Sequence, residues 1–339
     1  MKKLIIFDAD SIIFTVAWKF RTKKISNLVK LNTNKFISDV LRHANADDYL
    51  GFYGAKDEED TTNLKANFRY AVDSNYKANR PPTPDFVVKW RPVIHNEFKN
   101  NWGFLPVEGM EADDAVAIAV NKYRDQYDEI VVATFDKDLK QIPNIIFYNM
   151  RTHKMEEISK IEAYRNFYIQ MLMGDTSDNI PGLKGIGKVS AFKILKDCTT
   201  EYSLFRTTVC KYKEAENFAV KKKLEAITKS ILDMLADVEI DSSESEYKGL
   251  SGVKLERKIR INSKQELKEA AEETIPGGWK AYFNQQYKLL RMLTEETEDI
   301  VIPEVQVNPV KRDDTADVLA AQRALTGNDD DAMDDFLTF

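Results

Sequence analysis

Acidic residues recur at places where the chain's pattern predicts that strands end or helices begin. Asp8 directly follows the apolar run Lys3–Phe7, and two further acids follow the run Glu129–Thr134. Any single pair is typical of helix N-termini, where the helix macrodipole favours acids, and of turns, where acids accept hydrogen bonds from backbone N–H groups. Eight acids in four segments share this placement: Asp8; Glu111, Asp113 and Asp114; Asp136 and Asp138; Asp175 and Asp178.

Taken together, these acids predict a metal site. The carboxyl ends of the strands in an open α/β sheet line one crevice, so we expect Asp8, Asp136 and Asp138 to meet there. Eight carboxylates in one crevice would repel one another strongly unless cations lay between them. Oxygen ligands without His or Cys favour Mg²⁺ or Mn²⁺. Two such ions are the usual apparatus for phosphodiester cleavage.

A glycine-rich turn follows the last of these acids. Gly182, Gly185 and Gly187 alternate with Lys184 and Lys188 before a predicted helix. Closely spaced glycines let backbone N–H groups approach phosphate oxygens, and the helix dipole adds to the attraction. An ordinary turn between helices is the alternative, but the adjacent acids favour a grip on a duplex backbone.

Basic and aromatic residues alternate from Asn75 to Trp102, a composition that suits a strand of nucleic acid. Within this stretch, Tyr76, Lys77 and Arg80 are the candidate binding residues. We expect Phe86 and Phe98 instead to pack an amphipathic helix into the core.

The elements that must position these side chains are α/β in pattern. Short apolar runs at 3–7, 49–53, 129–134 and 145–148 alternate with helical periodicity at 34–46 and 111–124. This predicts a mostly parallel sheet covered by helices on both faces. From about Ser159 the pattern is helical only, at 161–173, 189–196, 212–237 and 279–293, with a polar loop at 241–252. Val318–Leu325 could form a further short helix.

Charge is unevenly distributed along the 339 residues. The chain has 49 Lys and Arg against 55 Asp and Glu, and the segment 304–339, with nine acids and three bases, carries the whole net charge of −6. Residues 1–303 are therefore neutral, and without the eight candidate ligands they are net +8, as a polyanion substrate requires.

Composition excludes several classes of protein. The two cysteines, Cys198 and Cys210, form no CxxC motif, which argues against a disulfide framework or a zinc site. No apolar run is long enough to span a membrane, and Asp8 and Asp10 interrupt the run that opens the chain. We expect no membrane association and a cytoplasmic location.

Five segments of the chain form a recognisable series: IIFDAD, NYKANRPPTPDF, EGMEADDAVA, TFDKDLKQIPN and GDTSDNIPGLKGIGKVSAFKIL. In this order and spacing they resemble the flap endonuclease/5′→3′ exonuclease family. The segments NYKANR and DKDLKQIPN resemble most closely the tailed-phage members of that family. The resemblance implies a 5′-nuclease (PIN-like) fold with a helical arch at about 76–102 and a helix–three-turn–helix at about 171–196. The implied division is a catalytic core at 1–158, a helical DNA-binding region at 159–302 and an acidic tail at 303–339.

The resemblance also implies residue roles. Asp8, Glu111, Asp113 and Asp114 would surround a first Mg²⁺ or Mn²⁺ ion, and Asp136, Asp138, Asp175 and Asp178 would complete that region and hold a second. Lys77 and Arg80 would orient the scissile phosphate, and Tyr76 would stack on a terminal base. Residues Gly182 to Lys188 would grip the duplex around a K⁺ ion, as in some relatives.

One departure concerns the end of the second strand. The family usually has a metal-site aspartate there, but this chain reads Gly51-Phe-Tyr-Gly54-Ala-Lys-Asp57. Asp57 or Asp60 could replace it from a longer loop, and spacing leaves this open. The gap also leaves open a weakened or catalytically silent junction-binding homologue.

The expected function is a 5′→3′ exonuclease that acts on duplex DNA and leaves 5′-phosphates. Cleavage of 5′ flaps and removal of primers from RNA–DNA hybrids are expected as further activities. The expected role is in phage replication or recombination inside the host cell.

The terminal run NDDDAMDDFLTF resembles peptides that bind single-strand-binding proteins or sliding clamps, so Phe336–Phe339 could dock such a partner. A replisome adaptor acting through this tail is a further alternative.

Overall fold

The computed structural model describes residues 1–22, 25–55, 67–236, 246–247, 249–295 and 307–310. The chain divides into two compact units. The core unit comprises Met1–Ala71, Arg80–Asn166 and Met292–Phe339, and the helical unit comprises Val72–Asn79 and Phe167–Arg291. The compact units meet at Asn166 and Phe167, and the short segment Val72–Asn79 groups with the helical unit. The functional division at 158/159 stays a prediction.

The core unit is built on one sheet with the strand order β3-β2-β1-β4-β5-β6. Strands β1 to β5 pair in parallel, β6 pairs antiparallel with β5, and β7 pairs antiparallel with the first residues of β2. The described strands are β1 Lys3–Asp8, β2 Asp48–Gly54, β3 Leu105–Val107, β4 Glu129–Thr134, β5 Ile145–Asn149, β6 Lys154–Ile158 and β7 Asn308–Pro309.

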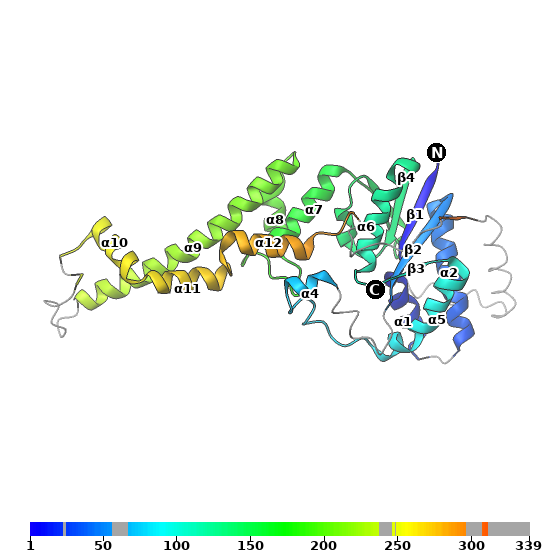
Figure 1. Ribbon diagram of the computed structural model, residues 1–339, viewed down its shortest axis with the longest axis horizontal. Coiled ribbons are helices and arrows are strands. Elements are labelled where there is room, and N and C mark those ends of the chain that lie inside the picture. Colours follow the sequence, from blue (N-terminus) through cyan, green and yellow to red (C-terminus); the bar gives the residue numbers. More distant parts are fainter. Residues whose placement is uncertain (23–24, 56–66, 237–245, 248, 296–306, 311–339) are drawn as a thin grey trace. The chain divides into compact units, whose positions relative to one another are not determined.

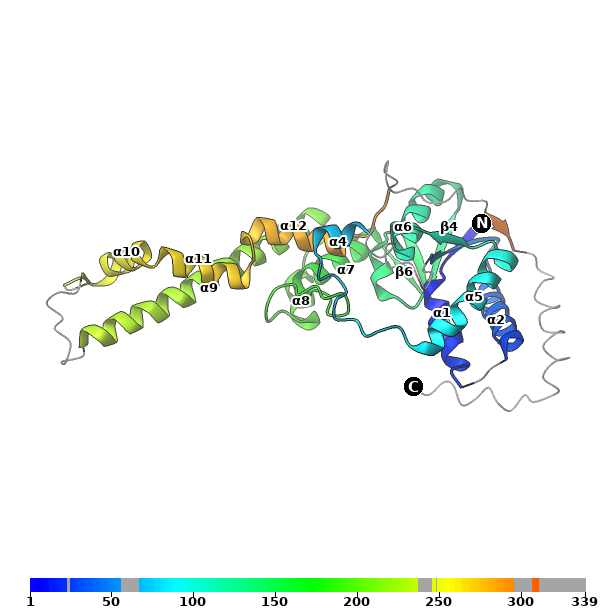
Figure 2. The same ribbon diagram turned by 60° about the horizontal axis from the view of Figure 1, so that its bottom comes forward.

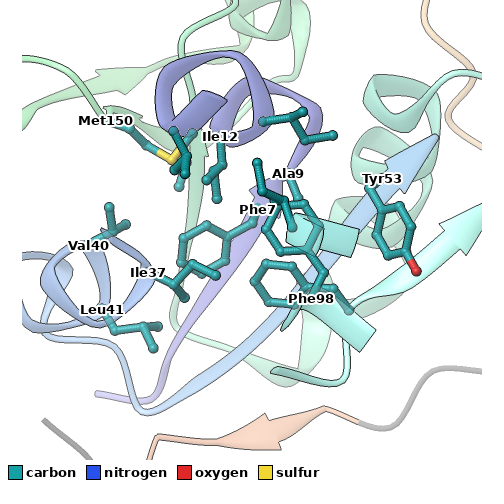
Figure 3. Packing of buried hydrophobic residues seen from close by; sticks show 14 of the residues in the cluster. Phe7, Ala9, Ile12, Ile37, Val40, Leu41, Tyr53, Phe98 and Met150 are labelled. Atoms are coloured by element: carbon teal, nitrogen blue, oxygen red, sulfur yellow. The ribbon is translucent and has the colours of Figure 1, made fainter. Parts of the chain in front are cut away.

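Alternating strand residues build two apolar layers, one on each face of the sheet. Leu4 and Ile6 of β1 pack with helix α6, whereas Ile5 and Phe7 pack on the opposite face with α1, α2 and α5 (Figures 1 and 3). Strands buried on both faces require apolar residues at successive positions, which explains the runs KLIIF and EIVVAT. The fold class expected from the sequence is thereby confirmed. The core-unit helices include α1 Asp10–Lys19, α2 Ser26–Ala44, α5 Asp85–Trp102 and α6 Ala112–Tyr123, and α4 Phe68–Val72 begins in this unit.

Helix α5 occupies most of the segment expected to form an arch. Val87, Trp90, Ile94 and Phe98 are buried in the layer shared with α1 and α2. The expected core role of Phe98 is confirmed. Helix α5 thus covers 85–102 of the expected arch and packs one face into the core. The rest of the expected arch, 76–84, precedes this helix.

The helical unit contains a long helix that two shorter helices accompany. Helix α9 packs against α11 and α10, and Leu224, Leu255, Ile259 and Leu267 form a small apolar cluster between them (Figure 2). Further along α9, Tyr212 is fully buried against Tyr282 and Phe283 of α12, and its hydroxyl donates to the carbonyl oxygen of Met171. The helices of this region are α7 Lys160–Met173, which begins in the core unit, α8 Lys188–Leu195, α9 Glu201–Ala236, α10 Gly252–Asn262, α11 Lys264–Thr274 and α12 Gly278–Leu290.

No described helix is both long and apolar enough to cross a membrane. Cys198 and Cys210 are free thiols, as the sequence predicts. The expected helix at 318–325, the tail residues Phe336–Phe339, and Asp57 and Asp60 lie outside the described residues.

Candidate metal and nuclease site

The core unit brings acids together at the point where the strand order reverses. Strands β1 and β4 are neighbours, and the connection after β1 leads to β2 on one side whereas the connection after β4 leads to β5 on the other side. Such a switch point opens a crevice at the carboxyl ends of the strands. Asp8 ends β1, and Asp136 follows β4 after Phe135, so both stand at this crevice as the sequence predicts.

Asp8 is buried, with 6% of its surface exposed. Its Oδ2 accepts hydrogen bonds from the hydroxyls of Ser11, at 2.5 Å, and Thr134, at 2.7 Å. Burial, followed by the nearby charge of Asp10, raises the pKa of Asp8 to about 7, and Asp136 adds to this effect. Because the folded carboxyl holds its proton more tightly than the unfolded one, its ionisation lowers stability between about pH 4 and pH 7, by roughly 4 kcal/mol in total. A divalent cation beside Asp8 would offset this cost.

Asp136 and Asp138 form a turn beside Asp8. The backbone N–H of Asp136 donates to Thr134 Oγ1 at 2.9 Å, and its own Oδ1 accepts the N–H of Asp138 at 2.8 Å. Thr134 therefore links the Asp136 turn to Asp8. The donors here are carboxylates and hydroxyls, the oxygen ligands that Mg²⁺ and Mn²⁺ prefer. Among the described side chains, no three of His, Cys, Asp and Glu have the spacing of a metal site.

The first turn of α6 carries the next three acids, which differ in their surroundings. Glu111 is the N-cap residue of α6, and Asp113 Oδ1 accepts the N–H of Asp114 at 2.7 Å. Both are partly exposed. Asp114 is fully buried, and its backbone and side-chain partners lie within the core unit.

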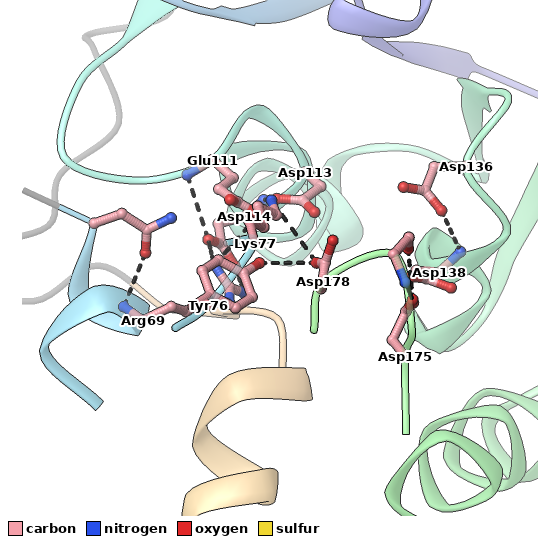
Figure 4. A network of polar contacts seen from close by, with 12 residues as sticks. Arg69, Tyr76, Lys77, Glu111, Asp113, Asp114, Asp136, Asp138, Asp175 and Asp178 are labelled. Atoms are coloured by element: carbon pink, nitrogen blue, oxygen red, sulfur yellow. Dashed lines mark hydrogen bonds and ion pairs between the residues drawn. The ribbon is translucent and has the colours of Figure 1, made fainter. Parts of the chain in front are cut away.

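The expected ligand Asp114 is paired with an arginine that sequence reasoning missed. Arg69 of α4 donates from Nη1 to Oδ2 at 2.6 Å and from Nη2 to Oδ1 at 2.9 Å (Figure 4). Oδ1 also accepts the N–H of Leu293 at 2.9 Å. A carboxylate has about four acceptor positions, so these donors leave little capacity for a metal ion. Arg69 Nη1 also lies 3.8 Å from Glu111 Oε2. The buried Asp114 thus fixes an arginine that in turn contacts the more exposed Glu111.

In the helical unit, the short loop that carries Asp175 and Asp178 contacts the segment that carries Tyr76 and Lys77. Asp175 pairs with Ile180 through two backbone hydrogen bonds of 2.8 Å. The N–H of Lys77 donates to the carbonyl oxygen of Asp178 at 2.9 Å, and Lys77 Nζ lies 3.8 Å from Asp178 Oδ2. Lys77 has φ +58°, a conformation that costs a non-glycine residue of order 1 kcal/mol. The loop therefore fixes a candidate catalytic lysine against a candidate metal ligand.

Tyr76 is not presented for the stacking role that the sequence suggested. Its ring is 2% exposed, with Lys77 Nζ 4.9 Å from the ring centroid. Its hydroxyl donates to Asp178 Oδ2 at 2.9 Å (Figure 4). The amphipathic ring thus acts as a support for Asp178 in this structure. Arg80 belongs to the core unit and is exposed.

Replacing Tyr76 by Phe separates these two roles, because it keeps the ring and removes only the hydrogen bond to Asp178. We expect the single-turnover rate of DNA cleavage to fall about tenfold, near the 1.4 kcal/mol of one hydrogen bond to a charged group, with little change in DNA affinity. Tyr202→Phe, at a 70% exposed tyrosine of the helical unit, is the matched control. An unchanged rate in Tyr76→Phe would favour stacking instead.

The glycine-rich turn has one buried and several exposed members. Gly182 is buried: its N–H donates to Gln286 Oε1 at 3.2 Å and its carbonyl oxygen accepts the hydroxyl of Tyr282 at 2.8 Å. An added Cβ would come within 2.2 Å of the backbone of Gly174, so Gly182 is needed for close packing. The exposed members, which remain available to a ligand, are Lys184, Gly185, Gly187 and Lys188.

Comparisons with known proteins identify the family of the chain. Residues 3–171 match the family described as 5′-3′ exonuclease, N-terminal resolvase-like domain. DNA polymerase I of Caldicellulosiruptor bescii is 28% identical over 242 residues, which cover 66% of this chain and 27% of that protein. The 5′-3′ exonuclease of Aquifex aeolicus is 27% identical over 218 residues, 61% of this chain and 72% of the relative. The chain thus spans about a quarter of the polymerase relative's length.

A solved structure of T5 5′-exonuclease with divalent metal ions (zinc) bound aligns at a TM-score of 0.47 and 15% identity, over 86% of this chain and 99% of that one. The fold is α/β, with a mostly parallel sheet covered by helices on both faces. On the match of residues 3–171, the chain belongs to the 5′→3′ exonuclease family.

Proposed function

We propose that this protein is a divalent-metal-dependent 5′→3′ exonuclease that acts on duplex DNA. The observation that carries the proposal is the buried carboxylate of Asp8, held at the switch point beside Asp10 and Asp136 in a chain of this family. Cleavage of 5′ flaps and removal of RNA primers from RNA–DNA hybrids are proposed as further activities, in phage DNA replication or recombination.

Acidic side chains would hold the ions. Those of the core unit are Asp8, Glu111, Asp113, Asp136 and Asp138. The sequence resemblance adds Asp175 and Asp178 to the proposed ligands. Bound Mg²⁺ or Mn²⁺, as two ions, would supply positive charge that polarises the attacking water and stabilises the leaving oxygen. Asp114 is left out of this ligand set, because Arg69 and Leu293 donate hydrogen bonds to its oxygens. Its proposed role is to support the site through Arg69.

Cationic side chains would position the substrate. Lys77, fixed in its turn by Asp178, would face the scissile phosphate and stabilise the charge that develops on it. Arg80 would contact the same phosphate or its neighbour. The exposed glycines and lysines of the turn at 184–188 would bind the duplex backbone, with K⁺ as a candidate ion.

Digestion of one duplex, labelled separately at its 5′ and 3′ ends, tests the proposal. With Mg²⁺ or Mn²⁺ we expect early release of the 5′ label as nucleotides or short oligomers, and with EDTA no release. Early loss of the 3′ label, or cleavage that persists in EDTA, would contradict the proposed polarity or the metal dependence.

The proposed binding of the duplex backbone by the turn at 184–188 can be tested at Gly185. Gly185 has φ +85° and no atom within 4 Å of an added Cβ, so Gly185→Val changes the turn through backbone strain and not through a clash. We expect duplex affinity to fall about tenfold, since the strain costs of order 1–3 kcal/mol. Gly249→Val is the control, because Gly249 lies outside the turn and also has a positive φ, of +75°, with no atom within 4 Å of an added Cβ. Equal dissociation constants for both variants and the parent would remove the grip from this turn.

A catalytically silent junction-binding protein is the second candidate, and the absence of an acid at Gly54 favours it. It predicts a gel shift with flap or junction DNA and no cleavage at any Mg²⁺ or Mn²⁺ concentration. The third proposal concerns the tail: Phe336–Phe339 would bind a single-strand-binding protein or a sliding clamp. Deletion of these residues should abolish such binding and leave cleavage of naked DNA unchanged.

A further inference from the structure

Asp10 lies where the core unit brings two strand ends together. Strands β1 and β2 run parallel with Asp8 opposite Phe52, and the N–H of Ala9 donates to the carbonyl oxygen of Phe52 at 2.8 Å. The next residue, Asp10, begins α1 and is exposed. Its carboxylate therefore stands at the carboxyl end of β2, although it belongs to the segment that follows β1.

Gly54, the last residue of β2, contacts this carboxylate directly. The N–H of Gly54 donates to Asp10 Oδ1 at 3.1 Å. A Cβ added to Gly54 would lie 3.1 Å from Asp10 Oδ2, tighter than an ordinary contact. Asp10 thus occupies the space that a side chain at position 54 would need. A carboxylate at 54 would also meet a like charge there, so the glycine and Asp10 fit together as a pair.

The ordinary role of an acid in the first turn of a helix does not account for these contacts. Acids at helix N-termini are favoured by the macrodipole, and Asp85 at the start of α5 is such a residue. The Asp10 carboxylate, in contrast, accepts a hydrogen bond from a strand 44 residues away. It also acts electrostatically on Asp8. Its position serves the crevice as well as its own helix.

We propose that Asp10 is a metal ligand that supplies, from the start of α1, the carboxylate that this chain lacks at Gly54. The inference rests on the proposed nuclease function and adds a residue to its metal site. It also removes the need for Asp57 or Asp60 to reach the crevice. The fold then fixes a carboxylate at one point beside Asp8, and the chain supplies it from a different segment.

Relocation of the carboxylate provides the test. Asp10→Ser removes it, and Asp10→Ser/Gly54→Asp returns it from β2. Gly54 has no positive φ, so aspartate is compatible with its backbone, and with Ser at position 10 the added Cβ no longer meets a carboxylate. Asp85→Ser is the matched control, because it removes the first-residue acid of another helix on the same unit. Asp136→Asn is the reference for loss of a ligand.

The readouts are the Mn²⁺ dissociation constant of the full chain, measured from the free-Mn²⁺ electron paramagnetic resonance signal, and the melting temperature. We expect Asp10→Ser to raise the dissociation constant at least about tenfold, as does Asp136→Asn, with the melting temperature kept. The double variant should recover most of the affinity, and Asp85→Ser should match the parent.

Three results separate the possible failures. Parental Mn²⁺ affinity in Asp10→Ser, alongside a loss in Asp136→Asn, overturns the inference and leaves the proposed function standing. Loss in Asp10→Ser without recovery in the double variant overturns the claim that Asp10 stands in for a residue at 54. A parent chain that neither binds Mn²⁺ nor cleaves DNA overturns the proposed function, and the ligand role of Asp10 with it.

Discussion

Asp136→Asn is expected to reduce DNA cleavage by about 10³-fold or more, equivalent to roughly 4 kcal/mol of lost transition-state stabilisation. The substitution removes the negative charge that would hold an ion at the switch point. Asparagine keeps a side-chain oxygen, so the turn in which Asp136 accepts the N–H of Asp138 should remain. Duplex affinity should be unchanged or tighter, because the crevice repels phosphate less.

Single-turnover cleavage and a binding titration on the same duplex measure the two effects. Asp125→Asn, an exposed acid in the short helix η1 (Arg124–Gln126) that precedes β4, gives the same change of charge at the other end of the sheet. Full activity in Asp136→Asn would remove this residue from the metal site. Equal losses in both variants would instead indicate a general effect of charge.

Asp114→Asn is expected to lower the free energy of unfolding by about 3–5 kcal/mol, the usual cost of breaking a buried ion pair. Arg69 would stay buried with its charge, and Glu111, one of its other acidic neighbours together with Asp113, lies 3.8 Å away. Leu293 would also lose a charged acceptor for its N–H. Denaturant unfolding of the full chain measures the change.

Arg69→Met/Asp114→Leu tests whether the cost arises from the unpaired charge. Replacing a buried pair by apolar side chains of similar size is often neutral or stabilising, so the double variant should recover most of the loss. Asp113→Asn, on the same helical turn but partly exposed, should change stability by less than about 1 kcal/mol. A loss below that value in Asp114→Asn would mean that Arg69 finds compensation elsewhere.

The sequence predicts best those elements whose residues are buried on both faces. EIVVAT is strand β4 over the full predicted range, since burial on both faces demands a continuous apolar run. Strand β6 was not predicted, because Lys154–Glu157 are all exposed and three of the four are charged, on the antiparallel edge of the sheet. Helix α9 begins eleven residues before the predicted start at 212, because Tyr202 and Phe205 on its exposed surface blur the helical periodicity.

The candidate site also has a part that the sequence predicts and a part that it does not. The placement of Asp8 and Asp136 follows from strand order alone, so a reader of the sequence can predict it. The contacts of Asp10 with Gly54 and of Arg69 with Asp114 join residues 44 and 45 positions apart. They depend on strand register and on the path of the chain after β2. Two signals were present in the sequence: the spacing of Asp8 and Asp10 two residues apart, and a basic residue at Arg69 beside a run of apolar ones.

Strand β7 ties the last described residues of the chain to the start of β2. Asn308 and Pro309 pair with the first two residues of β2, and the N–H of Val310 donates to the carbonyl oxygen of Asp47. The seven-residue strand β2 places this pairing about 20 Å from Gly54, at the opposite end of the sheet. A label attached at Val310 would therefore be held at the end of the sheet remote from Asp8. For single-molecule work on this protein, Val310 is an attachment point that leaves the switch-point crevice of the core unit unobstructed.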